Sequence, residues 1–207
     1  MTSPGRLIAF EGGEACGKST QAAILAHRLD AVLTHEPGGT EVGSRIRALL
    51  LDPGTVDLDA RAEALLMAAD RAQHVATVVR PALAAGRDVV TDRYIGSSLA
   101  YQGYGRELGV DDVARISAWA TAGLEADMVV LLDVPDAVAA ARLGAARDRL
   151  EAERPDFHRR VIEGFRALAA ARPGQWVVVD GVGTIEDVAA RVEAAVAGRI
   201  ERPGPPS

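Results

Sequence analysis

The sequence predicts an α/β fold in which helices cover both faces of a five-stranded parallel sheet. Five short apolar runs alternate along the chain with longer stretches whose apolar residues recur at helical spacing. The runs lack the apolar–polar alternation of a half-exposed strand, so both of their faces are expected to be buried. The predicted strands comprise residues 7–10, 31–34, 88–91, 128–134 and 176–179, of which 31–34 is the weakest. The predicted helices comprise residues 21–29, 40–51, 60–85, 110–124, 137–143, 155–171 and 184–196.

Length and composition indicate one domain over residues 1–200 and a disordered tail over residues 201–207. The chain has 207 residues, 48% of them hydrophobic, and no linker divides it, whereas the tail is rich in proline. The formal net charge of −6 disfavours a general nucleic-acid or membrane-surface binder. Because the chain has one cysteine, no signal-peptide pattern and no apolar stretch of membrane-spanning length, we expect a soluble cytoplasmic protein.

A glycine-rich segment after the first predicted strand is the most informative motif. Residues 12–20 read GGEACGKST and fit the phosphate-binding pattern G-x-x-x-x-G-K-[ST], with Gly12, Gly17, Lys18 and Ser19 at the fixed positions. Glycines let the backbone wrap around a polyphosphate, which then faces the amides at the start of the next helix. Lys18 adds a positive charge, and the Ser19 hydroxyl can bind Mg²⁺. A plain glycine turn is the alternative, but the order strand, loop and helix favours phosphate binding.

Other polar motifs follow further strands, at the edge where parallel sheets bind ligands. Asp92 and Arg93 end the third strand, where the acid can support a Mg²⁺ shell and the guanidinium can bind a second phosphate. An ion pair at the end of a strand is the alternative interpretation. Residues 36–40 (EPGGT) form a rigid turn that opens a helix containing Arg47, or else a simple turn before a solvated helix.

Three later segments carry side chains that suit a nucleotide. Met67 and Arg71 share one helix face, where an apolar side chain and a guanidinium can hold a planar base. Taken alone, such a methionine is more often core, and a lone histidine such as His74 is more often at the surface. Residues 97–106 combine hydroxyls, an amide, aromatics and glycines, which suits a nucleoside pocket. The charged segment over residues 143–154, which contains Arg149, is interpreted as a lid over phosphates, with a solvated helix as the alternative.

Together these motifs resemble those of bacterial thymidylate kinases, which are P-loop enzymes of the nucleoside monophosphate kinase type. The resemblance covers nearly the whole chain, and its most specific parts are EPGGT (36–40), DRAQH (70–74) and DRYIGSSLAYQG (92–103) in that order. It implies a three-layer α/β/α P-loop kinase fold and transfer of the ATP γ-phosphate to dTMP, giving dTDP, with Mg²⁺ as cofactor. It also implies a homodimer, for which the predicted helices over residues 60–85 and 110–124 can supply the contact.

The resemblance further implies roles for individual residues. Lys18, Arg93 and Arg149 are expected to be catalytic by neutralising phosphoryl charge, and Arg142 is expected to lie against the adenine. The residues expected to bind ATP are Gly12, Gly13, Glu14, Ala15, Cys16, Gly17, Lys18, Ser19, Thr20 and Arg142. The residues expected to bind dTMP are Glu14, Glu36, Arg47, Met67, Arg71, Arg93, Ser98, Tyr101 and Gln102. The residues expected to hold the metal are Ser19 and Asp92.

Three positions depart from the usual pattern of the family. Met67 replaces a base-stacking phenylalanine, His35 replaces the arginine before EPGGT, and Ala15 occupies a loop position where some members carry an arginine. The catalytic cation is therefore expected from the lid, and another nucleoside monophosphate remains an alternative acceptor. A nucleotide-dependent switch protein would need a guanine-reading N-K-x-D motif, which the sequence lacks. An inactive binding module conflicts with the intact phosphate-binding motif.

Overall fold

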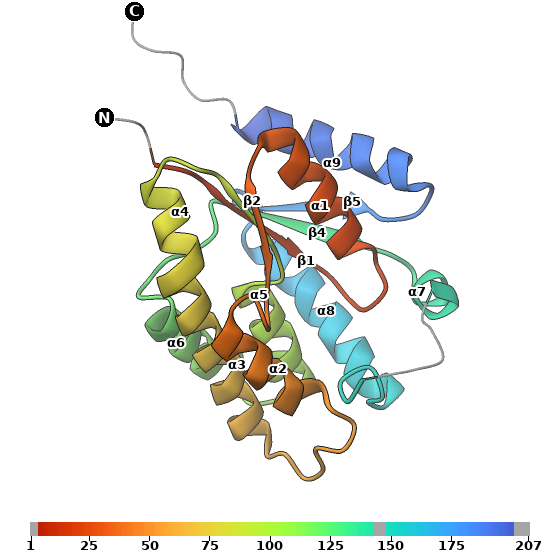
Figure 1. Ribbon diagram of the computed structural model, residues 1–207. Helices are drawn as coiled ribbons and strands as arrows, with labels where there is room; N and C mark the ends of the chain where they lie inside the picture. Colours follow the sequence, from red (N-terminus) through yellow and green to blue (C-terminus); the bar gives the residue numbers. More distant parts are fainter. Residues whose placement is uncertain (1–3, 143–147, 201–207) are drawn as a thin grey trace, which may run out of the picture.

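The computed structural model describes residues 4–142 and 148–200 and confirms the five-stranded parallel sheet. The strand order is β2-β3-β1-β4-β5, and every pair of neighbouring strands is parallel (Figure 1). The strands are β1 (Leu7–Glu11), β2 (Val32–His35), β3 (Val89–Asp92), β4 (Met128–Asp133) and β5 (Trp176–Asp180). Because all five run in one direction, their carboxyl ends form a single edge of the sheet.

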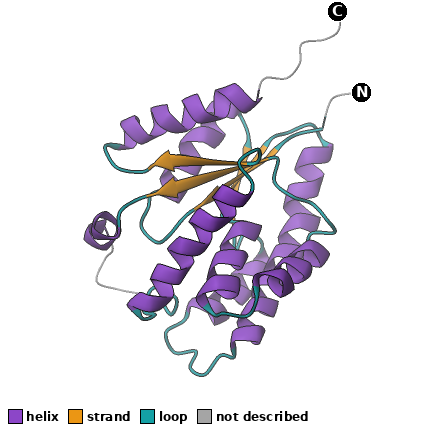
Figure 2. Cartoon of the chain, turned by 180° about the vertical axis from the view of Figure 1, so that it is seen from behind, coloured by secondary structure: helices purple, strands orange, loops and turns teal. Residues whose placement is uncertain are grey.

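Two helical layers enclose the sheet. Figures 1 and 2 show α1 (Lys18–Leu29) and α9 (Ile185–Ile200) on one face and a larger group of helices on the other. Leu7 and Ala9 of β1 belong to a core built with α8, whereas Ile8 and Phe10 belong to a second core built with α1 and α9. Side chains of β1 thus point alternately into two cores, which explains why the strand is apolar at successive positions. The other α-helices of the described chain are α2 (Glu41–Leu51), α3 (Ala60–His74), α4 (Arg80–Ala84), α5 (Ile95–Ser98), α6 (Val110–Ala120), α7 (Asp136–Arg142) and α8 (Pro155–Ala171).

A π-helical turn interrupts the single helix predicted over residues 60–85. This turn, η1 (Val75–Val79), separates α3 from α4, and the Arg80 amide donates to the carbonyl of Val75, five residues earlier. Pro81 follows directly and has no amide hydrogen, and its ring would clash with the carbonyl four residues earlier in a regular α-helix. The wider turn accommodates the proline, so the helical path continues to residue 84.

Residues 95–105 are helical, although their sequence predicts no helix. Helix α5 leads into a π-helical segment, η2 (Leu99–Gly105), which packs against α8 and α6. Three glycines in this stretch weaken any helical signal. Gly105 meets a packing need, because a Cβ there would lie 2.6 Å from the Phe157 ring. Tertiary packing therefore overrides local propensity in this stretch.

Two further predictions concern the ends and the lid of the chain. The predicted tail over residues 201–207 and residues 143–147 of the predicted lid lie outside the described residues. The domain limits therefore remain a prediction. No helix within residues 4–142 and 148–200 is long and apolar enough to cross a membrane.

Candidate active site

A cleft of about 660 Å³ lies at the carboxyl ends of the strands. Its walls come from the loop after β1, the turn after β2, the segment after β3 and one face of α3, which is the edge where parallel sheets bind ligands. The predicted site residues that line it are Glu14, Ala15, Gly17, Lys18, Ser19, Thr20, Glu36, Arg47, Met67, Arg71, Asp92, Arg93, Ser98, Tyr101, Gln102 and Arg142. Of the other predicted residues, Gly12, Gly13 and Cys16 belong to the phosphate-binding loop, and Arg149 lies outside the lining.

The phosphate-binding loop adopts backbone conformations that favour glycine at two fixed positions. Gly12 has φ +145° and Gly17 has φ +98°, and a Cβ on Gly12 would lie 2.6 Å from the carbonyl oxygen of Leu132. Helix α1 begins at Lys18, so the free amides of its first turn face the loop. The Lys18 ammonium is buried and donates to the carbonyl oxygen of Gly13 at 2.6 Å. The loop therefore presents backbone amides and one ammonium group to an anion.

Ser19 and Asp92 form a pair of oxygen ligands that fits a metal ion. Ser19 Oγ donates to Asp92 Oδ2 at 2.5 Å and so joins α1 to the end of β3. Asp92 Oδ1 is buried and has no hydrogen-bond partner in the described part of the chain. Mg²⁺ prefers oxygen ligands and commonly combines one or two protein groups with phosphate oxygens.

Arg93 lies at the centre of a charged cluster that joins the loop to the segment after β3. Its guanidinium donates to Glu14 Oε1 at 2.8 Å and to Ser97 Oγ at 3.1 Å. The Tyr101 hydroxyl donates to Glu14, and the Arg93 guanidinium lies 5.0 Å from the centre of the Tyr101 ring. Burial alone would raise the pKa of Glu14, but the charges of Arg93 and Lys18 outweigh burial and lower this pKa to about 2. Arg93 has φ +70°, a conformation that is rare outside glycine and often marks functional positions.

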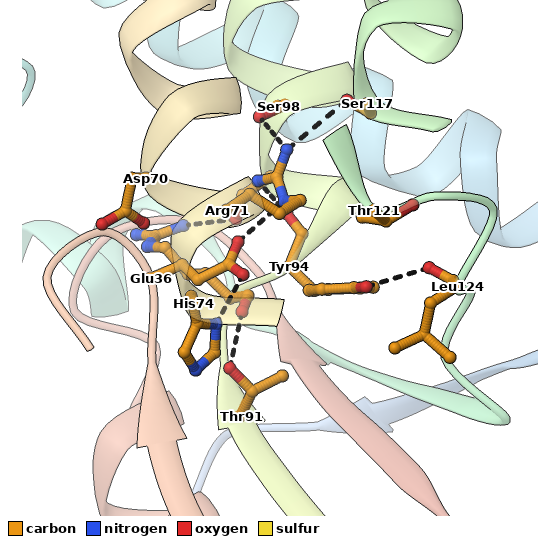
Figure 3. Close-up of polar contacts among 12 residues, drawn as sticks. Glu36, Asp70, Arg71, His74, Thr91, Tyr94, Ser98, Ser117, Thr121 and Leu124 are labelled. Atoms are coloured by element: carbon orange, nitrogen blue, oxygen red, sulfur yellow. Dashed lines mark hydrogen bonds and ion pairs between the residues drawn. The ribbon is translucent and has the colours of Figure 1, made fainter. Parts of the chain in front are cut away.

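A buried ion network holds Arg71 at the other end of the cleft (Figure 3). Arg71 is 2% exposed and donates through Nε to Glu36 Oε2 at 2.7 Å. The same guanidinium donates to Ser98 Oγ at 3.0 Å and to the carbonyl oxygen of Tyr94 at 3.0 Å. The second carboxylate oxygen of Glu36 contacts His74 Nδ1 at 2.8 Å. These bonds join α3, the turn after β2 and α5, and they fix the guanidinium plane.

Three more predicted residues lie near Arg71. Met67 is half-buried, packs against the core and lines the cleft one helical turn before Arg71. Gln102 is buried and donates through Nε2 to Glu63 Oε1 at 2.9 Å. Arg47 is exposed and donates to a carbonyl oxygen of the turn after β2 at 2.9 Å. An apolar surface, an amide and two guanidinium groups thus meet at this end of the cleft.

The two arginines near the predicted lid lie in different settings. Arg142 ends α7, lines the cleft and donates to the carbonyl oxygen of Gly181 at 3.1 Å. Arg149 donates through Nε to the carbonyl oxygen of Leu50 at 2.7 Å and through Nη2 to Glu63 Oε2 at 2.6 Å. Because a buried carboxylate holds its guanidinium, the structure does not bring Arg149 to the cleft.

Comparison with known proteins identifies the family of the chain. A family model described as thymidylate kinase matches residues 10–192. The chain belongs to the thymidylate kinase family. The thymidylate kinase of Leifsonia xyli subsp. xyli is 50% identical in an alignment that covers 95% of this chain and 97% of that protein. A thymidylate kinase of Synechococcus is 48% identical over 93% of this chain and 95% of that protein. The crystal structure of thymidylate kinase from Ehrlichia chaffeensis is similar with a TM-score of 0.78 at 28% identity, covering 93% of this chain and 100% of that one.

Membership of the thymidylate kinase family confirms three predictions made from the sequence. These are the family itself, the α/β P-loop kinase fold and an ATP-dependent nucleoside monophosphate kinase. A kinase is therefore favoured over a nucleotide-dependent switch protein. Met67 and His35, two of the residues that depart from the usual pattern of the family, both line the cleft. Burial, followed by the nearby charge of Arg47, lowers the pKa of His35.

In this member of the thymidylate kinase family, the burial of three titratable side chains could hardly be predicted from the sequence. Glu11 ends β1 and accepts hydrogen bonds from the amides of Tyr94 and Ser97 and from the Ser97 hydroxyl, yet burial raises its pKa to about 7. The sequence indicates its importance only by its position directly after the apolar strand predicted over residues 7–10. His74 is fully buried, contrary to the surface position expected of a lone histidine. Glu63 is also fully buried, although a glutamate in the first turn of a helix usually faces solvent.

Proposed function

We propose that the protein transfers the γ-phosphoryl group of ATP to the phosphate of dTMP, giving dTDP and ADP. The observation that carries the proposal is a single cleft with a phosphate-binding loop at one end and the buried guanidinium of Arg71 at the other. Arg93 lies between them, beside Glu14 of the loop. The names of the relatives agree with thymidylate as the acceptor.

The loop end of the cleft is proposed to bind ATP. The amides of residues 12–20 and the Lys18 ammonium would contact the β- and γ-phosphates. Ser19 and Asp92 would hold Mg²⁺, which supplies positive charge at the phosphates when it is bound. Arg142, beside the loop that follows β5, would lie against the adenine.

The Arg71 end of the cleft is proposed to bind dTMP. Arg47 and Arg93 would contact its phosphate, and Glu14 would contact its sugar. The Tyr101 ring beside Glu14 would leave little room for a 2′-hydroxyl. Arg71 would reach the edge of the thymine. The other residues proposed to contact dTMP are Glu36, Met67, Ser98 and Gln102.

Alignment and charge neutralisation are the proposed sources of catalysis. A phosphate oxygen of dTMP bonds to the γ-phosphorus as the bond from that phosphorus to the β,γ-bridging oxygen of ATP breaks. The attacking oxygen is already anionic, so the transfer needs no general base. Lys18 and Arg93 offset the repulsion between the two anions. The catalytic role of Arg149 stays a prediction, because in the structure Glu63 and Leu50 hold its guanidinium.

A panel of acceptors tests the proposal. Purified protein would be assayed with ATP and Mg²⁺ against dTMP, dUMP, dCMP, AMP and GMP, with ADP release and the phosphorylated product both measured. We expect the highest kcat/KM with dTMP. A higher value with another acceptor would replace dTMP in the proposal, and ADP release without a phosphorylated acceptor would refute it.

We also propose that the protein forms a homodimer through α3 and α6. The support is two large apolar side chains on these neighbouring helices, Leu65 at 57% exposure and Trp119 at 84% exposure. Sedimentation of the wild type and of Trp119→Ser would test this, since the variant should shift toward the monomer. The cytoplasmic location predicted from the sequence stays a prediction.

A further inference from the structure

Glu63 is a buried carboxylate that gathers three side chains from two other segments of the chain. It lies on α3 with 0% exposure, and its Oε1 accepts from Gln102 Nε2 at 2.9 Å. Arg106 donates to both oxygens, through Nε at 3.1 Å and through Nη2 at 2.9 Å. Arg149 donates to Oε2 at 2.6 Å. Glu63 does not line the cleft, but Gln102 does.

The charge of Glu63 determines which way the Gln102 amide faces. Burial alone would raise the pKa of Glu63, but hydrogen bonds from Arg106, Gln102 and Arg149 outweigh burial and lower it. The carboxylate is therefore ionised at neutral pH and can only accept hydrogen bonds. An amide oxygen turned toward it would repel it, so Gln102 must present its NH₂ group to Glu63.

The other end of the same amide is left for a ligand. Within the part of the chain that the structure describes, no group donates to Gln102 Oε1. Gln102 lines the same cleft and follows Ser98, the residue that accepts a hydrogen bond from Arg71, by about one helical turn. The amide therefore contributes a fixed hydrogen-bond acceptor to the cleft that Arg71 also lines.

We propose that Glu63 is a positioning residue that sets acceptor selectivity by holding the Gln102 carbonyl oxygen toward the pyrimidine. This inference rests on the proposed function. The ring N3 of thymine or uracil carries a hydrogen and donates to such an oxygen. The ring N3 of cytosine carries a lone pair instead, and two acceptors facing each other repel. Glu63 thus discriminates against a cytosine base that it never touches.

The variant Glu63→Gln should reverse the amide of Gln102. Two arginine N–H groups point at the Oε2 position and one, from Arg106 Nε, points at the Oε1 position, so the new side chain should place its oxygen at Oε2, where it accepts the larger number of hydrogen bonds. Its NH₂ group then occupies the Oε1 position and faces Gln102. To accept a hydrogen bond from this group, Gln102 must turn its oxygen toward residue 63 and its own NH₂ group toward the cleft. A donor then meets the N3–H of thymine, whereas cytosine gains a partner.

The test compares kcat/KM for dTMP and for dCMP in the wild type and in Glu63→Gln. We expect the ratio of dTMP to dCMP to fall at least tenfold, because one mispaired buried hydrogen bond changes affinity by about that factor. The KM for ATP should stay within twofold, since Glu63 lies outside the loop end of the cleft. An unchanged ratio in a folded Glu63→Gln protein overturns the proposal.

Two further variants separate positioning from a general loss of structure. Arg106→Gln removes other hydrogen bonds of the same carboxylate and should lower Tm without changing the acceptor ratio. Gln102→Met removes the amide, so adding Glu63→Gln to it should leave the ratio where Gln102→Met alone puts it. A further fall of the ratio in the double variant would mean that Glu63 acts by another route.

A structure of the wild type with dTMP tests the same inference without depending on the stability of any variant. Gln102 should keep its hydrogen bond to Glu63 while its other amide atom faces N3, and loss of the bond to Glu63 would overturn the proposal. Failure of the proposed function would look different from failure of this inference, because the wild type would then not phosphorylate dTMP at all.

Discussion

The buried pair of Glu36 and Arg71 allows the sharpest prediction about stability. Glu36 side-chain oxygens contact Arg71 at 2.7 Å and His74 at 2.8 Å, and the side chains of Glu36 and Arg71 are each 3% exposed. The variant Glu36→Gln keeps the shape of the side chain but removes its charge, so a buried guanidinium loses its counter-ion. Breaking a buried pair in this way costs about 3–5 kcal/mol, and the lower end applies because the amide oxygen still accepts one hydrogen bond.

The expected effect on melting temperature follows from this free energy. For a chain of about this length, 1 kcal/mol lowers Tm by about 2–4 °C, so Glu36→Gln should lower Tm by roughly 6–12 °C. Differential scanning calorimetry at neutral pH measures this shift directly. The KM for dTMP should also rise more than the KM for ATP, because the network that fixes Arg71 lies at the acceptor end.

A matched variant controls for the chemical change itself. Glu41 pairs with Arg45 at 2.9 Å, but the two side chains are 86% and 80% exposed. Exposed pairs contribute little because water screens them, so Glu41→Gln should leave Tm nearly unchanged. Equal Tm shifts in Glu36→Gln and Glu41→Gln would refute the reasoning that burial makes the Glu36 pair important.

Three other predictions concern catalysis and pH. Lys18→Ala should lower kcat by at least about 100-fold with the fold intact by circular dichroism, because it removes the ammonium of the phosphate loop; a near-normal rate would remove Lys18 from the mechanism. Catalysis by Arg149 requires its guanidinium to leave Glu63, and Arg149→Ala should then lower kcat more than it changes KM for dTMP; unchanged kcat with a lower Tm would show that Arg149 only anchors its segment to Glu63. Burial raises the pKa of Glu11 from 4.5 to about 7, so its contribution of about 3 kcal/mol is complete below pH 4.5 and is lost as pH rises through 7. Glu11→Gln cannot ionise and should flatten the Tm profile between pH 5 and 8; an identical slope in both proteins would contradict this assignment.

Most of the sheet could be predicted because its three central strands, β3, β1 and β4, are largely apolar and buried, whereas the edge strands β2 and β5 are partly exposed. In β1, Ile8 and Phe10 enter one core and Leu7 and Ala9 enter the other, so the strand is apolar at successive positions. The phosphate-binding loop was equally clear, since its glycines meet backbone requirements that the sequence pattern already encodes.

Features that depend on tertiary packing could not be predicted from local sequence. Residues 95–105 are helical because they pack between α6 and α8, where Gly105 lets the Phe157 ring approach closely. The burial of Glu63 depends on Arg106 and Arg149, which come from distant segments. For the same reason the sequence could not show that Arg149 faces Glu63 rather than the cleft.

The protein is proposed to hold two nucleotides in one cleft, with ATP on the loop and dTMP on the side of Arg71. A crystal structure of the protein with ADP, Mg²⁺ and dTMP tests this arrangement most directly. We expect the β-phosphate of ADP against the amides of residues 12–20, the dTMP phosphate within hydrogen-bond distance of Arg93, and the thymine beside Arg71 and Gln102. A thymine bound elsewhere, or a dTMP phosphate beyond the reach of Arg93, would refute this arrangement of the two nucleotides.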